Sequence, residues 1–582
     1  MNSSKHHPAR TTFAVAVFAC LSLAACGPEP TTLAPVAESA AEPPAQREAG
    51  PGADRVFVNG HIWTGTEPAW AESLAIADGR IAAVGLRQDV EALAGGTTEV
   101  IDLDGHTVVP GFIDNHVHFI RGGLAMQRVD LRDADSPEEF ARRIGERARQ
   151  RPGEWITEGS WDHEMWGGEL PHRDWIDAIT GDTPVFVMRL DWHMALANSA
   201  ALRLAGIDDA TGTPAGGEII RDADGRITGL LKDEAMALVN RVIPLPTDAQ
   251  IDEALQAATD HALARGVTQV HDMGEWGHLE AFQRTREAGV LRLRVYEFAP
   301  IAHAEELAAY VEERGRGDDW LSWGGVKGFV DGSLGSTTAW FYQPYSDAPE
   351  TSGLTMGDTD VLAERIATAD RLGLQVAIHA IGDRANDWLL DTFESVIAAN
   401  GPGDRRFRIE HAQHLTAEAI PRFGALGVIP SMQPYHCIDD GRWAEKRIGP
   451  DRIQRTYAFR SLLDAGAPLT FGSDWAVAPI DPLTGMYAAV TRRTIDDQNP
   501  GGWVPVQMIT AEEAVRAYTE TNAWAGSQED RLGRISPGFL ADFVVLAEDP
   551  FAVDPVRLRE IAVLRTVIGG RDAFVAEPAA QP

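Results

Sequence analysis

Two histidines separated by one residue are the first feature of this sequence that could do chemistry. His116 and His118 follow the apolar run 108–113, which contains a Pro-Gly pair. In an extended strand, residues i and i+2 point to the same side, so both imidazoles can reach one metal ion. An H-x-H pair is a weak signal by itself, because two surface histidines can share this spacing. Its place directly after an apolar strand makes a metal site the favoured interpretation.

Lys327 is the second such residue, because it lies inside the apolar run 325–330. Lysine is seldom buried without a partner, and burial lowers its pKa, which makes the neutral amine available for reaction. Carboxylated by CO₂, Lys327 would be an anionic ligand able to bridge two metal ions. The alternative is a lysine that reaches solvent with its ammonium group or pairs with Asp331.

Three further polar residues follow apolar runs in the same way: His379, His411 and Asp474. The two histidines are 32 residues apart, a separation that suits one βα unit. Neutral imidazoles and carboxylates are the ligands that zinc prefers, and bound zinc lowers the pKa of a coordinated water to about 7. Asp474 is the candidate general base that takes a proton from this water and passes it to a leaving amine.

Apolar runs alternating with amphipathic segments must position these residues. Between about 108 and 524 this alternation predicts parallel βα units that close into a (β/α)₈ TIM-like barrel, an α/β fold. The predicted strands are 108–109, 184–188, 267–270, 326–330, 375–378, 407–409 and 469–471, with another at 428–431. Residues 132–180 and 200–245 exceed the length of ordinary loops, so part of them is expected to form a lid or inserted subdomain.

Short β-like runs flank this central region at both ends of the ordered chain. They predict one composite β-sandwich domain assembled from both terminal segments. The expected boundaries are 54–110 for the first part of the sandwich, 111–525 for the barrel with its inserted segments, and 526–575 for the second part.

The N-terminal residues indicate export. Basic residues precede the apolar run 12–23, which is too short to span a bilayer and is typical of a signal peptide, expected over 1–25. The run ends in Leu-Ala-Ala-Cys, which resembles a bacterial lipobox and predicts a lipid anchor at Cys26. The alternative is a plain secretory signal cut nearby. Residues 26–53 are rich in Pro and Ala and predict a disordered tether, so the protein is expected to be periplasmic and bound to a membrane only through lipid.

Composition limits the classes of partner. The 582 residues are 44% hydrophobic and 24% charged, which is ordinary for a globular protein, and the formal net charge is −35. Such an acidic surface repels phosphate backbones, so nucleic acid is excluded as the expected partner and a small-molecule substrate is favoured. Whether the chain forms a homo-oligomer stays open.

Several longer motifs accompany the residues above. They are DWHMALANSAAL (191–202), GGEI (216–219), VKGFVDGSLGSTT (326–338), HAIGD (379–383), RIEH (408–411) and GSD (472–474). Over residues 54–570, the sequence resembles the amidohydrolase superfamily, in particular its amidohydrolase 3 branch of YtcJ-like and N-substituted formamide deformylase-like proteins. The resemblance implies a barrel beside a β-sandwich, and hydrolysis of C–N bonds other than peptide bonds.

The resemblance also implies a binuclear metal site with two zinc ions. His116, His118 and Asp474 would hold one ion, while carboxylated Lys327 would bridge to a second ion held by His379 and His411.

Four residues are expected to contact substrate. His193 and Asp331 could orient it, although a structural role is as well supported for each. Trp192 replaces the glycine that is usual in this branch, and its indole would narrow the pocket. Trp475, next to Asp474, could line a hydrophobic pocket.

Rival functions remain at this point. A mononuclear deaminase-like hydrolase, or a lactonase or esterase, would use the same barrel, because an activated water does not by itself distinguish an amide from an ester. A non-catalytic binding lipoprotein would have no need for four strand-end histidines and an aspartate.

Overall fold

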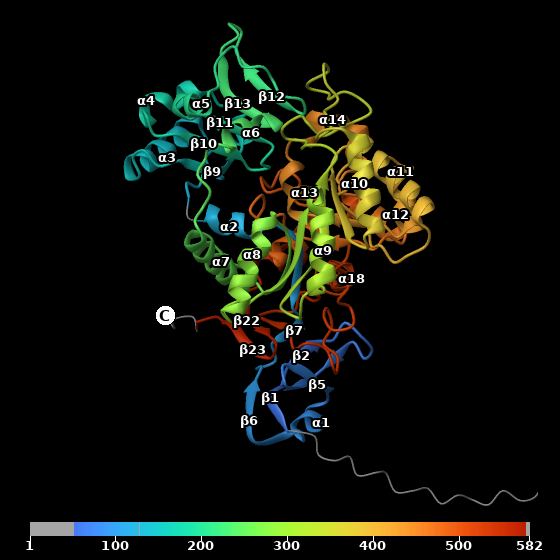
Figure 1. Cartoon of the computed structure of the whole chain (residues 1–582). Helices are drawn as coiled ribbons and strands as arrows, with labels where there is room; N and C mark the ends of the chain where they lie inside the picture. Colours follow the sequence, from blue (N-terminus) through green and yellow to red (C-terminus); the bar gives the residue numbers. More distant parts are fainter. Residues whose placement is uncertain (1–51, 127, 578–582) are drawn as a thin grey trace, which may run out of the picture. The chain divides into compact units, whose positions relative to one another are not determined.

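The computed structural model describes residues 52–126 and 128–577 (Figure 1). The predicted signal peptide, Cys26 and all of the predicted tether except Gly52 and Ala53 lie outside these residues, so the lipid anchor stays a prediction. Ala53 already begins the first strand. None of the helices in the described part of the chain is long and apolar enough to cross a membrane.

Eight parallel strands form the barrel, which confirms the predicted fold class. Every strand is fully or almost fully buried, as expected for strands covered on both faces. Backbone hydrogen bonds from Asp474 N to His116 O (2.7 Å) and from His118 N to Trp475 O (2.6 Å) join the last strand region to the first. The strands are β8 (Phe112–Val117), β14 (Val267–Met273), β15 (Arg294–Pro300), β16 (Leu321–Phe329), β17 (Gln375–Ala380), β18 (Arg408–His411), β19 (Ile429–Met432) and β20 (Thr470–Phe471).

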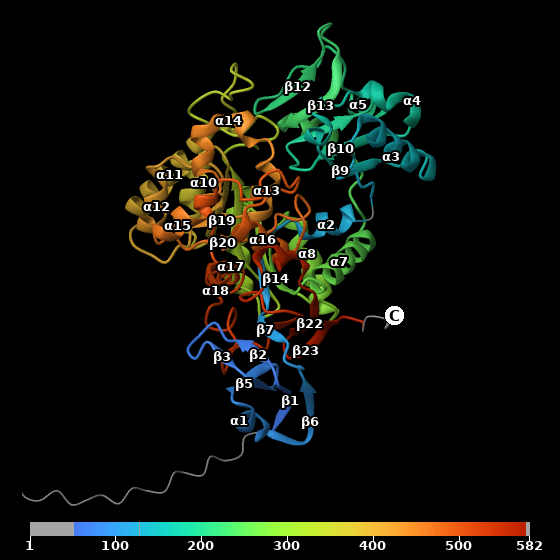
Figure 2. The same cartoon turned by 180° about the vertical axis from the view of Figure 1, so that it is seen from behind.

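Helices follow the strands along the chain and surround them (Figures 1 and 2). Local signals set several of their ends: Thr247 and Gln250, for example, form a capping box at the start of α7. The helices of the barrel are α2 (Phe119–Ala125), α7 (Asp248–Leu263), α8 (Trp276–Glu287), α9 (Ala304–Arg314), α10 (Thr359–Arg371), α11 (Asp383–Asn400), α12 (Ala419–Leu426), α13 (Pro434–Asp440), α14 (Ala444–Arg452), α15 (Phe459–Asp464), α16 (Pro482–Thr491), α17 (Ala511–Tyr518) and α18 (Glu520–Ala525).

Strands from both ends of the chain share one sheet, as the sequence predicted. Its six strands run in the order β23-β22-β21-β7-β2-β3, and a four-stranded sheet, β5-β4-β1-β6, packs against it through contacts such as Phe57 on Phe543. The strands are β1 (Ala53–Val58), β2 (His61–Trp63), β3 (Trp70–Ala71), β4 (Ser73–Ala77), β5 (Arg80–Gly85), β6 (Ala94–Asp102), β7 (Thr107–Pro110), β21 (Phe543–Leu546), β22 (Val563–Ile568) and β23 (Arg571–Val575), with α1 (Arg87–Glu91) beside them.

An inserted subdomain separates β8 from β14. Its five-stranded sheet has the order β12-β13-β11-β10-β9. The strands β9, β12 and β13 lie within residues 132–180 and 200–245, where the sequence predicted a lid or insertion, whereas β10 and β11 lie between these two ranges. Its elements are α3 (Pro137–Gln150), β9 (Ile156–Trp161), α4 (Asp177–Thr180), β10 (Val185–Arg189), β11 (Met194–Ala197), α5 (Ser199–Ala205), β12 (Gly217–Arg221), β13 (Ile227–Asp233) and α6 (Ala237–Asn240).

Two predicted barrel strands belong to other sheets. Residues 108–109 lie in β7 of the composite sheet, and residues 184–188 correspond to β10 of the insertion. The barrel instead uses β15 and β8, neither of which is among the predicted strands. Buried strands of different sheets share the same apolar character, so their pattern does not reveal which sheet they join.

Candidate metal centre

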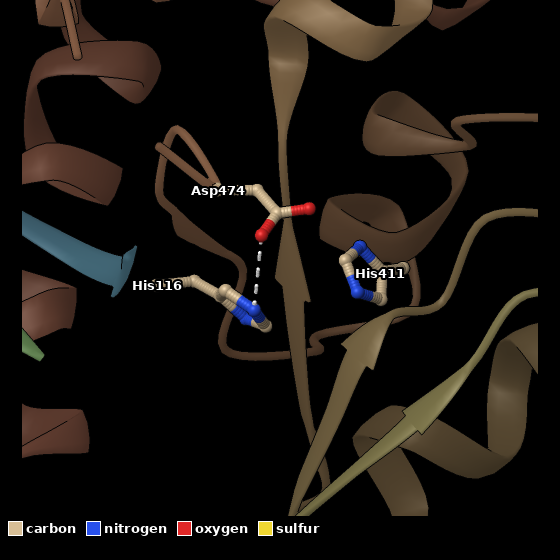
Figure 3. A group of neighbouring side chains, drawn as sticks. All are labelled: His116, His411 and Asp474. Atoms are coloured by element: carbon tan, nitrogen blue, oxygen red, sulfur yellow. Dashed lines mark ion pairs between the residues drawn. The ribbon is translucent and has the colours of Figure 1, made fainter. Parts of the chain in front are cut away.

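Three side chains from distant parts of the chain bring their donor atoms together at the carboxyl end of the barrel. Ligand atoms of His116, His411 and Asp474 lie within 4.8 Å of one another. His116 belongs to β8, His411 ends β18, and Asp474 follows β20. Figure 3 shows the three side chains facing a common space, with His116 Nε2 and Asp474 Oδ1 3.4 Å apart.

The other predicted ligands surround this group. His118 Nε2 is also 3.4 Å from Asp474 Oδ1, and the rings of His379 and His411 are 4.5 Å apart between centroids. His118, Lys327, His379, His411 and Asp474 all line one cavity of about 270 Å³. The structure therefore gathers all six predicted ligands in one place.

The donors have the properties that a divalent cation requires. His116 Nε2 and Asp474 Oδ1 are buried and make no hydrogen bond, which is costly for polar atoms. A metal ion between them would satisfy both, and imidazole nitrogen with carboxylate oxygen is a zinc-type ligand set. The residues present thus fit a metal ion.

The imidazoles are held in the neutral form that binds metal. Burial lowers the pKa of His116 to about 4, and it holds the pKa values of His379 and His411 well below the ordinary value for histidine.

Hydrogen bonds fix the second ring nitrogen of three of these histidines. His116 Nδ1 lies 2.5 Å from Glu410 Oε2, and His411 Nδ1 lies 2.7 Å from Gln433 Oε1. His379 Nε2 lies 3.0 Å from the carbonyl oxygen of Gly332. Such contacts set the tautomer and leave the opposite nitrogen of each ring free to bind a metal.

Glu410 contacts a predicted ligand, His116, and the sequence analysis did not single it out. It is fully buried, and besides His116 it accepts hydrogen bonds from Arg408 (2.7 Å) and Ser431 (2.6 Å). Burial raises its pKa, but Arg408 and His116 outweigh that effect and hold the pKa far below the ordinary value. Glu410 is therefore ionised. Its place inside the RIEH motif, directly before His411, is the sequence feature from which a role for Glu410 could have been predicted.

Lys327 is buried, as predicted, and burial lowers its pKa to about 8. Its Nζ lies 4.6 Å from the centroid of the Phe329 ring. The alternative partner, Asp331, instead accepts backbone hydrogen bonds from residues 340, 381 and 382 at 2.7–2.9 Å. Lys327 thus has the increased fraction of neutral amine that its position in the strand predicted.

Asp474 stays ionised although it is buried. Burial alone raises its pKa, but His116, His118 and His436 outweigh this effect and hold the pKa well below the ordinary value. His436, on α13, places Nε2 3.3 Å from Asp474 Oδ2. The sequence analysis missed His436, although a histidine just after the predicted strand 428–431 was an available signal.

Two of the expected substrate-contacting residues line the cavity. His193 is one of them, and its Nδ1 lies 2.7 Å from Asp233 Oδ1. Burial lowers the pKa of His193, but the nearby Asp233 carboxylate outweighs burial, so the pKa of His193 is raised above its ordinary value. Trp192 is the other. The Arg121 guanidinium lies 4.0 Å from the centroid of the Trp192 ring, and the buried Nε1 of Trp192 has no hydrogen-bond partner.

Asp331 and Trp475 lie outside the cavity lining. The backbone hydrogen bonds to Asp331 brace the loop after β17, and its Oδ1 lies 3.7 Å from His379 Nε2, so Asp331 supports this loop and a predicted ligand from outside the cavity. Trp475 packs on Phe119 and stacks on His261 at 5.5 Å between centroids. The expectation that Trp475 lines the pocket is therefore corrected: the chain turns after Asp474, whose φ is 59°, and the indole enters the helix layer.

Comparisons with known proteins agree with this geometry. The profile of the Amidohydrolase family (Amidohydro_3) matches residues 99–574. The chain is 42% identical to Protein LONG AFTER FAR-RED 3 of Arabidopsis thaliana, over 90% of this chain and 92% of that protein. It is 29% identical to N-substituted formamide deformylase of Arthrobacter pascens, over 89% of this chain and 97% of that protein.

A solved structure supports the same assignment. The crystal structure of an uncharacterized metal-dependent hydrolase from Pyrococcus horikoshii OT3 is similar, with a TM-score of 0.70 and 31% sequence identity, covering 86% of this chain and 99% of that one. The chain therefore belongs to the amidohydrolase family and is a metal-dependent hydrolase.

Proposed function

We propose that this protein hydrolyses an amide-type C–N bond, other than a peptide bond, in a small molecule. The observation that carries the proposal is that three predicted imidazole ligands, a lysine and a carboxylate line one cavity, and that His116 lies directly beside two of them. The similarity to an N-substituted formamide deformylase supports a C–N bond as the target.

We propose two zinc ions as the cofactor. His116, His118 and Asp474 would hold one ion, His379 and His411 the other, and carboxylated Lys327 would lie between them. Carboxylation joins Lys327 Nζ to the carbon of CO₂ and releases one proton, and the lowered pKa of Lys327 favours it by supplying neutral amine. Bound zinc lowers the pKa of water and polarises a carbonyl group.

The chain's own residues then move the proton. Asp474 is ionised, so it can accept a proton from water and deliver it to the leaving nitrogen, which departs as an amine. His436 contacts the other carboxylate oxygen and fixes the orientation of Asp474. Asp233 raises the pKa of His193 and favours its protonated form, in which Nδ1 donates to Asp233 and Nε2 can donate a hydrogen bond to the substrate carbonyl. Trp192 and Arg121 cover one side of the cavity.

Lys327→Ala tests the binuclear site. Loss of the bridging carboxylate should lower zinc content from about two ions per chain to one or fewer, and hydrolysis should fall by about 100-fold or more. The full chain would be loaded with zinc and assayed on N-formyl compounds, N-acyl amines, cyclic amides and lactones. Labelled bicarbonate should add a carbamate carbon signal to the wild type and to the control variant, but not to Lys327→Ala. Lys446→Ala, at an exposed lysine, is the matched control.

The outcomes separate the rival functions. One zinc ion per chain with unmodified Lys327 and undiminished activity of Lys327→Ala would replace the binuclear centre with a mononuclear one. Cleavage of lactones without amides would make the protein a lactonase, and no turnover of any compound would favour a binding role.

A further inference from the structure

A second group of potential metal ligands lies outside the catalytic cavity. Ligand atoms of Asp272, Glu297 and His278 lie within 4.8 Å of one another. Asp272 and Glu297 are paired directly across the neighbouring strands β14 and β15, so their side chains lie next to each other on one face. His278 is on α8, which follows β14.

This group lies on the helix side of the barrel wall. The residue before Asp272 is His271, whose Nδ1 lies 3.1 Å from Arg408 Nη1 of the non-neighbouring strand β18, across the barrel interior. Because successive side chains of a strand alternate, Asp272 points the other way, toward the helices. Its Oδ1 accepts a 2.7 Å hydrogen bond from the backbone N–H of Phe119, the first residue of α2.

The two carboxyl groups are buried without enough partners. Asp272 and Glu297 are at most 1% exposed, and Asp272 Oδ2 and both oxygens of Glu297 accept no hydrogen bond. Burial, with Asp272 beside it, raises the pKa of Glu297 well above the ordinary value. If the two carboxyl groups shared one proton, the resulting hydrogen bond would join only two of these three oxygens. At least one buried oxygen would still lack a hydrogen-bond partner.

A glycine leaves room where the donors meet. A Cβ atom on Gly274 would lie 2.2 Å from Glu297 Oε1, 3.0 Å from Asp272 Oδ2 and 3.0 Å from His278 Nδ1. The three donor atoms therefore surround the position that a side chain would occupy. His278 Nδ1 is 3.6 Å from Asp272 Oδ2. It accepts a long, 3.3 Å hydrogen bond from the backbone N–H of Glu275, and a cation bound at Nδ1 would take the place of this N–H.

We propose that Asp272, Glu297 and His278 bind a divalent cation of the zinc or manganese class at a structural site separate from the catalytic cavity. Donors around one such ion, at about 2.1 Å from it, lie roughly 3 to 4 Å apart, and His278 Nδ1 and Asp272 Oδ2 have such a separation, 3.6 Å. One nitrogen and two carboxylates suit these metals. The cation would neutralise the buried acids, and through Asp272 and Phe119 it would stabilise the segment that carries His118.

The test is the location and number of bound ions. Wild-type crystals of the full chain, soaked in manganese chloride, should show an anomalous peak between the three side chains. Glu297→Gln keeps the side-chain volume and should lose this peak and one manganese ion per chain in solution. Glu305→Gln, on the exposed surface of α9, should lose neither.

Two results would overturn the proposal: wild-type crystals without a peak at this position, or Glu297→Gln with an unchanged ion count. The wild-type map decides even if the variant does not fold. A peak among His116, His411 and Asp474 is scored separately, so failure of the catalytic centre and failure of this site are distinguishable.

Discussion

His116 depends on a residue that would not touch the metal or the substrate. Its Nδ1 faces Glu410, which is itself held by hydrogen bonds from Arg408 and Ser431. The carboxylate accepts the Nδ1 proton and leaves Nε2 unprotonated toward Asp474. Glu410 is thus a positioning residue for the metal ligand.

Glu410→Gln should weaken zinc binding by about 10- to 100-fold, the usual effect of losing a carboxylate behind a histidine ligand. The amide carries no charge, and its NH₂ group cannot accept from Arg408 or from His116. Zinc affinity is measured by competition with a chelator, and Glu418→Gln, at an exposed glutamate of the same type, is the control. Equal affinities of the two variants would show that Glu410 does not tune the ligand.

At the scale of elements, the short helix α2 connects the ligand strand to the helix layer. It starts directly after His118 and packs against α7. Two glycines permit the close approach: a Cβ on Gly122 would lie 2.5 Å from the Trp475 ring, and one on Gly123 would lie 2.1 Å from the backbone oxygen of Ala254. The position of His118 therefore depends on this contact.

Gly123→Ala should lower the free energy of unfolding by about 1 to 3 kcal/mol, because the added methyl group meets backbone that cannot move aside. It should also weaken zinc binding, since α2 must shift and His118 with it. Both effects are measured by urea denaturation and zinc titration of the full chain. Gly277→Ala is the control, because that helical glycine has open space around it and alanine favours helix. If Gly123→Ala is as stable as Gly277→Ala, the packing argument is wrong.

At the scale of the whole molecule, a buried ion pair joins the barrel to the composite sandwich. Arg294 of β15 contacts both oxygens of Asp542, at 2.5 and 2.9 Å, just before β21. Asp542 also accepts from the backbone N–H of Gly569 at 2.8 Å. Both side chains are at most 4% exposed, so solvent screens the pair little.

Asp542→Asn should destabilise the protein by about 3 to 5 kcal/mol, because it leaves the Arg294 charge buried and uncompensated. Asp530→Asn, at an exposed aspartate paired with Arg531, should change stability by less than about 1 kcal/mol. Chemical denaturation compares the two variants. A small effect for both would mean that the junction does not depend on this pair.

The sequence by itself determined the fold class, the composite terminal sheet and the six candidate ligands that the structure brings together at the carboxyl end of the barrel. It could do so because parallel strands of a barrel end on the same side, so a polar residue after each apolar run indicates a shared site. Export, the lipid anchor at Cys26 and the oligomeric state stay predictions, since the first two depend on residues outside the described part of the chain.

Only the tertiary structure decided which sheet each apolar run joins and where each neighbouring side chain points. The strand β10 joins the sheet of the insertion by pairing with the adjacent strand β11 and, across α4, with the parallel strand β9. The apolar pattern of β10 does not specify these partners. In the same way, the turn at Asp474 directs Trp475 away from the cavity, while α13 brings His436 to Asp474. These positions result from contacts between residues far apart in the chain, and periodicity along the chain carries no information about such contacts.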